Sequence, residues 1–259
     1  MRKRLSYYIL FLVVLCMAAV PALPQVKGAA VSHEYDPVKN TVTLHVTNTS
    51  GRDITAYNIK IKETYGQKVR EHDYSTDTLG IVLNIQEWVG TDRGEQLRAQ
   101  FGNGTLQAGA SRDEVQHVQP GLTNYEATVD TVIYSDKTAE TTNQDALDRA
   151  LSFRKSEVST LQTTNDIIKK AMANTQDPAP NETAAKEIEQ VQQTWETQHH
   201  AGNLNAGALH AVILELRNAP AISAHENKTL RPYLNEYLTK KNERVSALLE
   251  HAAPKVGAQ

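Results

Sequence analysis

Cysteine is nearly absent from this sequence. The 259 residues contain a single cysteine, Cys16, which lies inside an apolar run near the N-terminus. If that run is removed after Ala22, the remaining chain has no thiol. A disulfide framework, a cysteine nucleophile and a thiolate metal site are then excluded together.

Aromatic residues and clusters of basic residues are also scarce. Phe, Trp and Tyr make up 6% of the chain, and the lysines and arginines are scattered along it. Removal of residues 1–22 leaves 24 of the 27 basic residues against 30 acidic ones, a formal charge of −6. Nucleic-acid binding needs a basic track or stacking aromatics. We therefore expect no nucleic acid among the partners.

The first residues are typical of a secretory signal. A basic cluster at residues 2–4 precedes an apolar run at residues 7–20, and small residues follow up to Ala22. The run is shorter than the roughly 20 apolar residues of a membrane-spanning helix, although a retained anchor is the alternative. Residues 1–22 are therefore predicted to be a cleaved signal peptide. The mature protein is predicted to be extracytoplasmic, either periplasmic or secreted, with no stable membrane span.

Residues 42–61, VTLHVTNTSGRDITAYNIKI, have the two-residue period of β-strands. Apolar and polar side chains alternate on both sides of a Ser-Gly turn, which predicts a strand, a short connection and a second strand. Ile54 is out of phase with the second strand. We therefore predict either a β-bulge or a later strand start near Ala56.

Two further segments are rich in β-branched and apolar residues. TLGIVLNIQEW, residues 78–88, and NYEATVDTVIYSD, residues 124–136, are predicted strands. Residues 90–104 are interpreted as a polar loop or an edge strand. Short strands punctuated by glycines, without intervening helical patterns, are typical of an antiparallel sandwich.

After residue 136 the period lengthens to that of a helix. Apolar residues recur at three- and four-residue steps from about residue 143 to residue 173, and Arg154 and Asn165 complete the same stripe. The pattern predicts one long amphipathic helix, which the prolines of QDPAPNE stop. Three further amphipathic stretches follow. Residues 143–253 are therefore predicted to form an all-α helical bundle or hairpin region, and the fold class is α+β.

The long helix has polar residues within its apolar stripe. If Arg154 and Asn165 were fully buried, a charge and an amide would need partners. We therefore expect the helix to pack against one neighbour, either its own C-terminal helices or a second copy, with these residues at the rim or paired across the contact.

The N-terminal half resembles the bacterial extracytoplasmic Ig-like modules of the FxLYD type. VTNTSGRDITAYNIKI is similar to their strand, N-x-S-G turn and second strand, and LQAGAS, residues 106–111, is similar to a later turn in which Ala108 replaces the usual proline. The expected Tyr-Asp step is present only as Tyr65-Gly66. The chain also resembles uncharacterised secreted proteins of soil bacteria. The resemblance implies an Ig-like sandwich over residues 29–136 and an envelope location, and it carries over no catalytic residues.

Histidines are concentrated in one region. His199 and His200 are adjacent, and His210 and His225 follow. Zinc-binding histidines on a helix are typically three or four residues apart, whereas adjacent side chains point about 100° apart. We interpret the pair as residues at a helix end, where protonated imidazoles suit the C-terminal dipole, and we predict no metal site.

Other arrangements that could carry chemistry are incomplete. Carboxylates can act in pairs. The candidate pairs, none within a known motif, are Glu34 with Asp36, Asp73 with Asp77, and Asp113 with Glu114. AGASRD lacks the closing glycine of a serine elbow, and FGNGTL fits a hairpin turn better than a phosphate loop. Trp88 and Trp195 are interpreted as core residues. No catalytic, cofactor-binding or metal-binding residue is predicted, and no cofactor.

The sequence therefore predicts an exported, non-enzymatic protein, a protein-interaction or structural module of the bacterial envelope. It would bind an unidentified protein partner or self-associate through the helical region. The alternative is a hydrolase or metal-binding enzyme with a site at the junction of the two halves, where ligands often bind. Polar side chains converging in a cleft at that junction would favour the enzyme.

Overall fold

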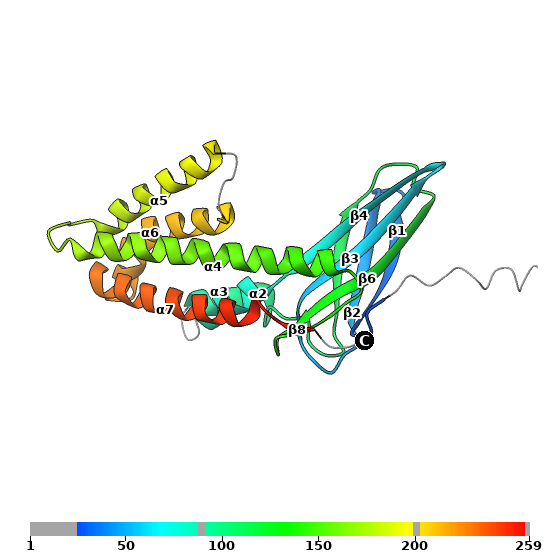
Figure 1. Cartoon of the computed structure of the whole chain (residues 1–259), viewed down its shortest axis with the longest axis horizontal. Helices are drawn as coiled ribbons and strands as arrows, with labels where there is room; N and C mark the ends of the chain where they lie inside the picture. The colour runs from blue at the N-terminus through cyan, green and yellow to red at the C-terminus, as the bar shows by residue number, and fades with distance from the viewer. Residues whose placement is uncertain (1–24, 88–91, 199–202, 257–259) are drawn as a thin grey trace, which may run out of the picture.

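The computed structural model describes residues 25–87, 92–198 and 203–256, and the chain is an α+β protein (Figure 1). Within these ranges it has eight strands and six helices. The strands are β1 (Ala29–Asp36), β2 (Thr41–Asn48), β3 (Ile54–Tyr65), β4 (Lys68–Asp77), β5 (Ser111–His117), β6 (Asn124–Tyr134), β7 (Thr138–Thr141) and β8 (Lys255–Val256). The helices are α2 (Leu79–Glu87), α3 (Asp92–Phe101), α4 (Gln144–Ala173), α5 (Pro180–Thr197), α6 (Ala206–His225) and α7 (Leu230–His251).

The strands form two sheets with one shared core. One sheet has the order β1-β2-β5, and the other has the order β4-β3-β6-β7-β8. Neighbouring strands are antiparallel except β8, which runs parallel to β7. Leu44, Ile59 and Val132, from both sheets, are fully buried in the same apolar cluster. We call these two sheets the β half and the helices the helical half.

The alternating pattern of residues 42–61 produces two strands, as predicted. Val42, Leu44 and Val46 of β2 are fully buried, while the intervening residues are partly exposed. β3 begins at Ile54, and its pairing with β6 shifts register between Ile54 and Ala56. The predicted bulge is therefore confirmed, and the out-of-phase Ile54 is buried because of it.

The predicted strand at residues 78–88 was wrong, because residues 79–87 form helix α2. Leu79 and Leu83, one turn apart, are buried in the core of the helical half. Asp77 accepts a hydrogen bond from the Leu79 N–H at 2.9 Å, which starts the helix. A short apolar run is compatible with a strand or with a helix. Here it is helical because Leu79 and Leu83 are then both buried in the core of the helical half. Trp88 lies outside the described residues.

Residues 90–104 also differ from the prediction of a loop or edge strand. Helix α3 covers residues 92–101, and Gly102 and Gly104 follow it with φ angles of 61° and 78°. Left-handed glycines of this kind end helices, so the segment is not a hairpin turn. Leu97 packs against the helical core. The chain therefore leaves the sheets after β4, contributes α2 and α3 to the helical half, and returns at β5.

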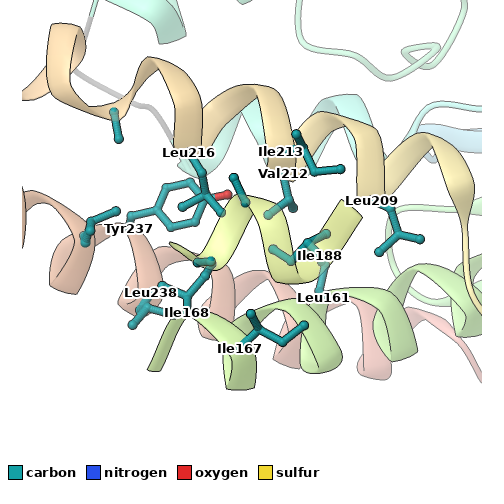
Figure 2. Close-up of a cluster of buried hydrophobic side chains, with 14 of the residues drawn as sticks. Leu161, Ile167, Ile168, Ile188, Leu209, Val212, Ile213, Leu216, Tyr237 and Leu238 are labelled. Carbon is teal, nitrogen blue, oxygen red and sulfur yellow. The ribbon is translucent and has the colours of Figure 1, made fainter. Parts of the chain in front are cut away.

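Helix α4 is the long helix predicted from the apolar stripe. The Asn143 side chain caps it by accepting a hydrogen bond from the Ala146 N–H at 3.2 Å. α4 lies beside α7 along its length (Figure 1). Figure 2 shows Leu161 and Ile168 of α4 among side chains of α5, α6 and α7. The stripe is therefore buried within the chain.

The apolar face of α5 is fully buried only in its first half. Ala184 and Ile188 have no exposed surface, Val191 is partly buried, and Trp195 is half-buried outside the core cluster. The prediction that Trp195 fills the helical core was wrong. α5 rises away from α4 toward its C-terminal end (Figure 1), so its last turns have fewer apolar neighbours.

A cluster of buried charges, the ion cluster, joins α2, α4, α6 and α7. Lys241 Nζ lies 3.0 Å from Glu87 Oε1 and 3.0 Å from Glu215 Oε2. Arg244 Nη2 lies 2.6 Å from Glu157 Oε1, and Arg244 Nη1 lies 3.5 Å from Glu87 Oε2. Opposite charges at such distances offset the cost of removing each from water.

Gly28 packs directly against a tyrosine of the β half. Its N–H donates to Glu140 Oε2 at 3.1 Å, and the Tyr134 hydroxyl donates to Glu140 Oε1 at 2.9 Å. Arg52 lies over the Tyr134 ring, 3.6 Å from its centroid. Burial, and then the bond to Glu140, raises the pKa of Tyr134 to about 12, so its hydroxyl remains a donor at neutral pH. A Cβ on Gly28 would lie 1.7 Å from that hydroxyl oxygen.

Gly28→Ala is therefore expected to destabilise the protein by about 1–3 kcal/mol, the usual cost of overpacking. The measurement is the midpoint of urea unfolding. Gly51→Ala is the matched control, because a Cβ there meets no atom of the described residues within 4 Å, and its effect should stay within about 0.5 kcal/mol. Equal midpoints for the two variants would contradict the close approach at Gly28.

Candidate functional site

A groove lies where the first turns of α4 cross the five-stranded sheet. Its volume is about 300 Å³, at the lower end of ligand pockets. It is lined by residues of β3, β4, β6 and α4. The apolar part of the lining consists of Ala56, Ile133, Ala146, Ala150 and Phe153. The small alanines of the helix leave this space open above the sheet.

Phe153 is the exposed aromatic residue of the groove. More than half of its surface, 53%, is exposed to solvent. Its neighbour along the helix, Arg154, is buried with 1% exposed, so the two residues point to different sides of α4. An exposed aromatic ring beside an apolar hollow is a typical anchor point of a binding surface.

A chain of hydrogen bonds joins the sheet to the start of α4. Ser75 Oγ donates to Asn58 Oδ1 at 2.6 Å, and Asn58 Nδ2 donates to Asp130 Oδ1 at 2.8 Å. Asn143, which caps α4, donates to the other oxygen of Asp130 at 2.7 Å. Asp130 is only 4% exposed, and the amides and the positive end of the helix offset its burial. This chain fixes α4 over the sheet and thereby shapes the groove.

A second hollow, of about 420 Å³, lies at the start of α4. Its lining is polar and includes Lys60, Asp130, Asn143 and Asp145. Asp130 and Asn143 already bond to each other, and Lys60 lies 3.5 Å from Glu71. Lys60 and Asp130 are therefore engaged with neighbours.

Two arginines of α4 hold carboxylates of β4 at the groove. Arg154 Nε lies 2.7 Å from Asp77 Oδ2, and Arg154 Nη2 lies 3.1 Å from Asp77 Oδ1, a two-point contact. Arg149 pairs with Asp73 at the surface. Arg154 also reaches Thr55 Oγ1 at 3.3 Å. Arg154 is therefore not at the rim of a helix contact as expected, but buried and paired with a carboxylate of the sheet. Asn165 is paired across the contact with α7, where its Nδ2 donates to Asn242 Oδ1 at 3.0 Å.

The groove lies at the junction of the two halves, and the polar side chains Asn58, Ser75, Asp77 and Arg149 of its lining are each paired with another protein group. Asp77 is held by Arg154, and Ser75 Oγ gives its proton to an amide oxygen rather than to a base. Among the described residues of its lining there is no histidine or cysteine.

The carboxylate pairs named from the sequence have structural partners. Asp36 accepts hydrogen bonds from two backbone N–H groups in the β1–β2 turn, and the one from Lys39 lowers its pKa the most. Asp113 lies 2.7 Å from His45 on the outer face of its sheet. Glu114 points inward, accepting from Tyr57 at 2.6 Å and from a second tyrosine at 2.8 Å. Glu34 lies 3.9 Å from His45 Nε2, so Glu34 and Asp113, which belong to different candidate pairs, lie against the same imidazole.

The histidines named from the sequence do not come together in the described part of the chain. His199 and His200 lie outside it. His210 and His225 are both exposed on α6, where 15 residues correspond to about 22 Å along the axis. The described residues contain no group of three or more His, Cys, Asp or Glu that could hold a metal.

The two turns that carry the family resemblance lie side by side. Asn48 Oδ1 accepts from the Ser50 N–H at 2.9 Å, and Asn48 Nδ2 donates to the Leu106 carbonyl at 2.8 Å. The Gly109 N–H donates to the Asn48 carbonyl at 3.0 Å. Ser111 Oγ bonds to Thr47 at 2.8 Å. These residues build the end of the β half, and their hydrogen bonds hold its two turns together.

Comparisons with known proteins give no functional assignment. No family model matches the sequence, and no curated protein matches it. A solved structure of a hypothetical protein from Peptoclostridium difficile 630 is matched over 46% of this chain and 89% of that chain, with 10% identity and a TM-score of 0.29. That likeness is too small to support a shared fold. Across the described residues, no helix is long and apolar enough to cross a membrane.

Proposed function

We propose that this chain is an exported, non-enzymatic binding module of the bacterial envelope, and that its groove takes a large apolar side chain of a protein partner. The exposed Phe153 beside the apolar hollow is the observation that carries this proposal. The signal-like N-terminus supports export. The two-sheet β half, with its adjoining turns at Asn48 and Gly109, supports an Ig-like module.

The dimensions of the groove favour a side chain over a larger ligand. A volume of about 300 Å³ accommodates one aromatic or branched aliphatic group, whereas most drug-sized ligands occupy larger pockets. The Arg149–Asp73 pair at the surface provides polar contacts at the rim. An apolar centre with a polar rim is the usual arrangement of a protein interface.

Selection of a random peptide library on the purified mature protein tests this function. Selected peptides should share an aromatic or large aliphatic residue, and Phe153→Ala should weaken their binding by tenfold or more, about 1.4 kcal/mol. Ala150→Trp, which fills the groove, should weaken it as well. Val38→Ala is the matched control, because Val38 is an apolar residue, 89% exposed in the β1–β2 turn, and its loss should change nothing.

Peptides that bind Phe153→Ala as tightly as the unaltered protein would contradict the proposal. Concentration-dependent dimerisation that Phe153→Ala abolishes would also overturn it, because the groove would then bind a second copy. Sedimentation of both proteins distinguishes these outcomes.

A further inference from the structure

The last described residues connect the helical half back to the β half. α7 ends at His251, and the chain continues through Ala252, which is 6% exposed, into β8. The Lys255 N–H donates to the Lys137 carbonyl at 2.9 Å, and Val256 pairs with Ala139 of β7. We call residues 251–256 the strap, because they fasten the end of α7 to the edge of the five-stranded sheet.

His251 lies at the point where the strap meets the junction. Its carbonyl accepts a hydrogen bond from Arg154 Nη1 at 3.2 Å. Its ring nitrogen Nδ1 is buried and has no hydrogen-bond partner within residues 25–87, 92–198 and 203–256. The groups that face it are Arg154 from α4, Asp77 from β4, Lys137 from the β6–β7 turn and Glu250 from its own helix, and Glu250 pairs with Lys137.

We propose that the strap is acid-sensitive: a proton on His251 releases residues 251–256 from β7 while both cores stay folded. A charged imidazole would lie beside two existing cations, Arg154 and Lys137, while Asp77 and Glu250 are already paired with those cations. A buried charge without its own partner is destabilising.

Burial lowers the pKa of His251 below its ordinary value of 6.5, and Arg154 and then Lys137 lower it further, against a smaller opposite effect of Glu250 and Asp77. The fastened strap therefore favours the neutral ring, whereas a released strap has the ordinary pKa. The fastened state is fully favoured above pH 6.5 and loses stability as the pH falls through the lowered pKa.

Release can remain local because little holds the strap. β8 consists of two residues, and Val256 is 52% exposed. Leu248, one turn earlier in α7, is fully buried in the helical core and remains anchored there. Release would leave the β7 edge unpaired, and an unpaired edge can accept another strand.

Hydrogen exchange measured by mass spectrometry tests the strap. In the unaltered protein, peptides containing Lys255 and Val256 should lose protection between about pH 7.5 and about pH 5 after correction for intrinsic rates, while peptides from the centre of α7 keep theirs. His251→Asn should retain strap protection at both pH values. His45→Asn is the matched control, since His45 faces the carboxylates Asp113 and Glu34, and it should respond to acid as the unaltered protein does.

The proposal is wrong if strap protection in the unaltered protein does not change with pH, or if His251→Asn loses it equally in acid. If His251→Asn lacks the strap at every pH, NMR titration of the unaltered protein decides instead. His251 should then titrate below its ordinary value of 6.5, together with the loss of strap protection, and a midpoint at or above 6.5 would overturn the proposal.

Discussion

Arg154→Met is expected to destabilise the protein by about 3–5 kcal/mol, the cost of breaking a buried ion pair from one side. The guanidinium is 1% exposed and contacts Asp77 at two points, Thr55, and the His251 carbonyl. Methionine would fill part of the space and leave the Asp77 carboxylate without its cation. Such a loss is a large part of the usual 5–15 kcal/mol of domain stability, and urea unfolding followed by circular dichroism measures it.

Arg149→Met is the matched control for this experiment. Arg149 lies on the same helix and also pairs with a β4 carboxylate, but its side chain is 54% exposed, and exposed pairs contribute about 0–1 kcal/mol. Adding Asp77→Asn to Arg154→Met should recover part of the loss, since asparagine can still accept the Leu79 N–H that starts α2. An Arg154→Met variant as stable as Arg149→Met would contradict a buried pair at the junction.

Lys241→Met is also expected to lower the free energy of unfolding by about 3–5 kcal/mol, because it removes a buried cation from the ion cluster of the helical half. Lys241 is 3% exposed and is shared between Glu87 and Glu215. Without it, three carboxylates would be left with Arg244 as the remaining cation of the cluster. α2 should loosen first, because Glu87 is the acidic residue it contributes to the cluster, and hydrogen exchange of α2 would detect this.

Lys240→Met provides the control at the adjacent position. Lys240 is 20% exposed and lies 3.3 Å from Glu236, one turn away on the same helix, and such helix pairs contribute about 0.3–0.5 kcal/mol. Combining Lys241→Met with Glu87→Gln should restore stability relative to Lys241→Met alone. Equal unfolding midpoints for Lys240→Met and Lys241→Met would show that the buried charges are not coupled.

Periodicity was sufficient to predict the long helix and the paired strands around Ser50, because each pattern is long enough to fit only one period. It failed at residues 78–88, where a short apolar run, Leu79 to Leu83, fits either a strand or a helix. Leu79 and Leu83 are buried in a core formed by helices that begin more than 60 residues later. A single segment read alone carries no information about such distant partners.

The groove could not be predicted from the sequence for a related reason. Ala56, Ile133 and Phe153 are separated by long stretches of chain and share a space only because α4 crosses the sheet. The one local signal is Phe153 itself, an apolar residue outside the stripe that contains Arg154. The partners of Arg154 could not be predicted either, because they lie in β3, β4 and at the end of α7. Its position in the apolar stripe did indicate that a buried guanidinium there would need partners.

The detour of the chain through α2 and α3 has a consequence for biosynthesis. When a ribosome has synthesised residue 142, the first seven strands are complete, but α4, α6 and α7, which supply most of the core around Leu79 and Leu83, have not yet been made. A protein truncated after β7 would therefore expose the apolar side chains of α2 to solvent. Exposed apolar surface of this kind is recognised by chaperones and proteases. Helices α2 and α3 of the helical half interrupt the β half between β4 and β5, and strand β8 follows the last helix. Neither half can therefore be expressed as one continuous segment with its core intact.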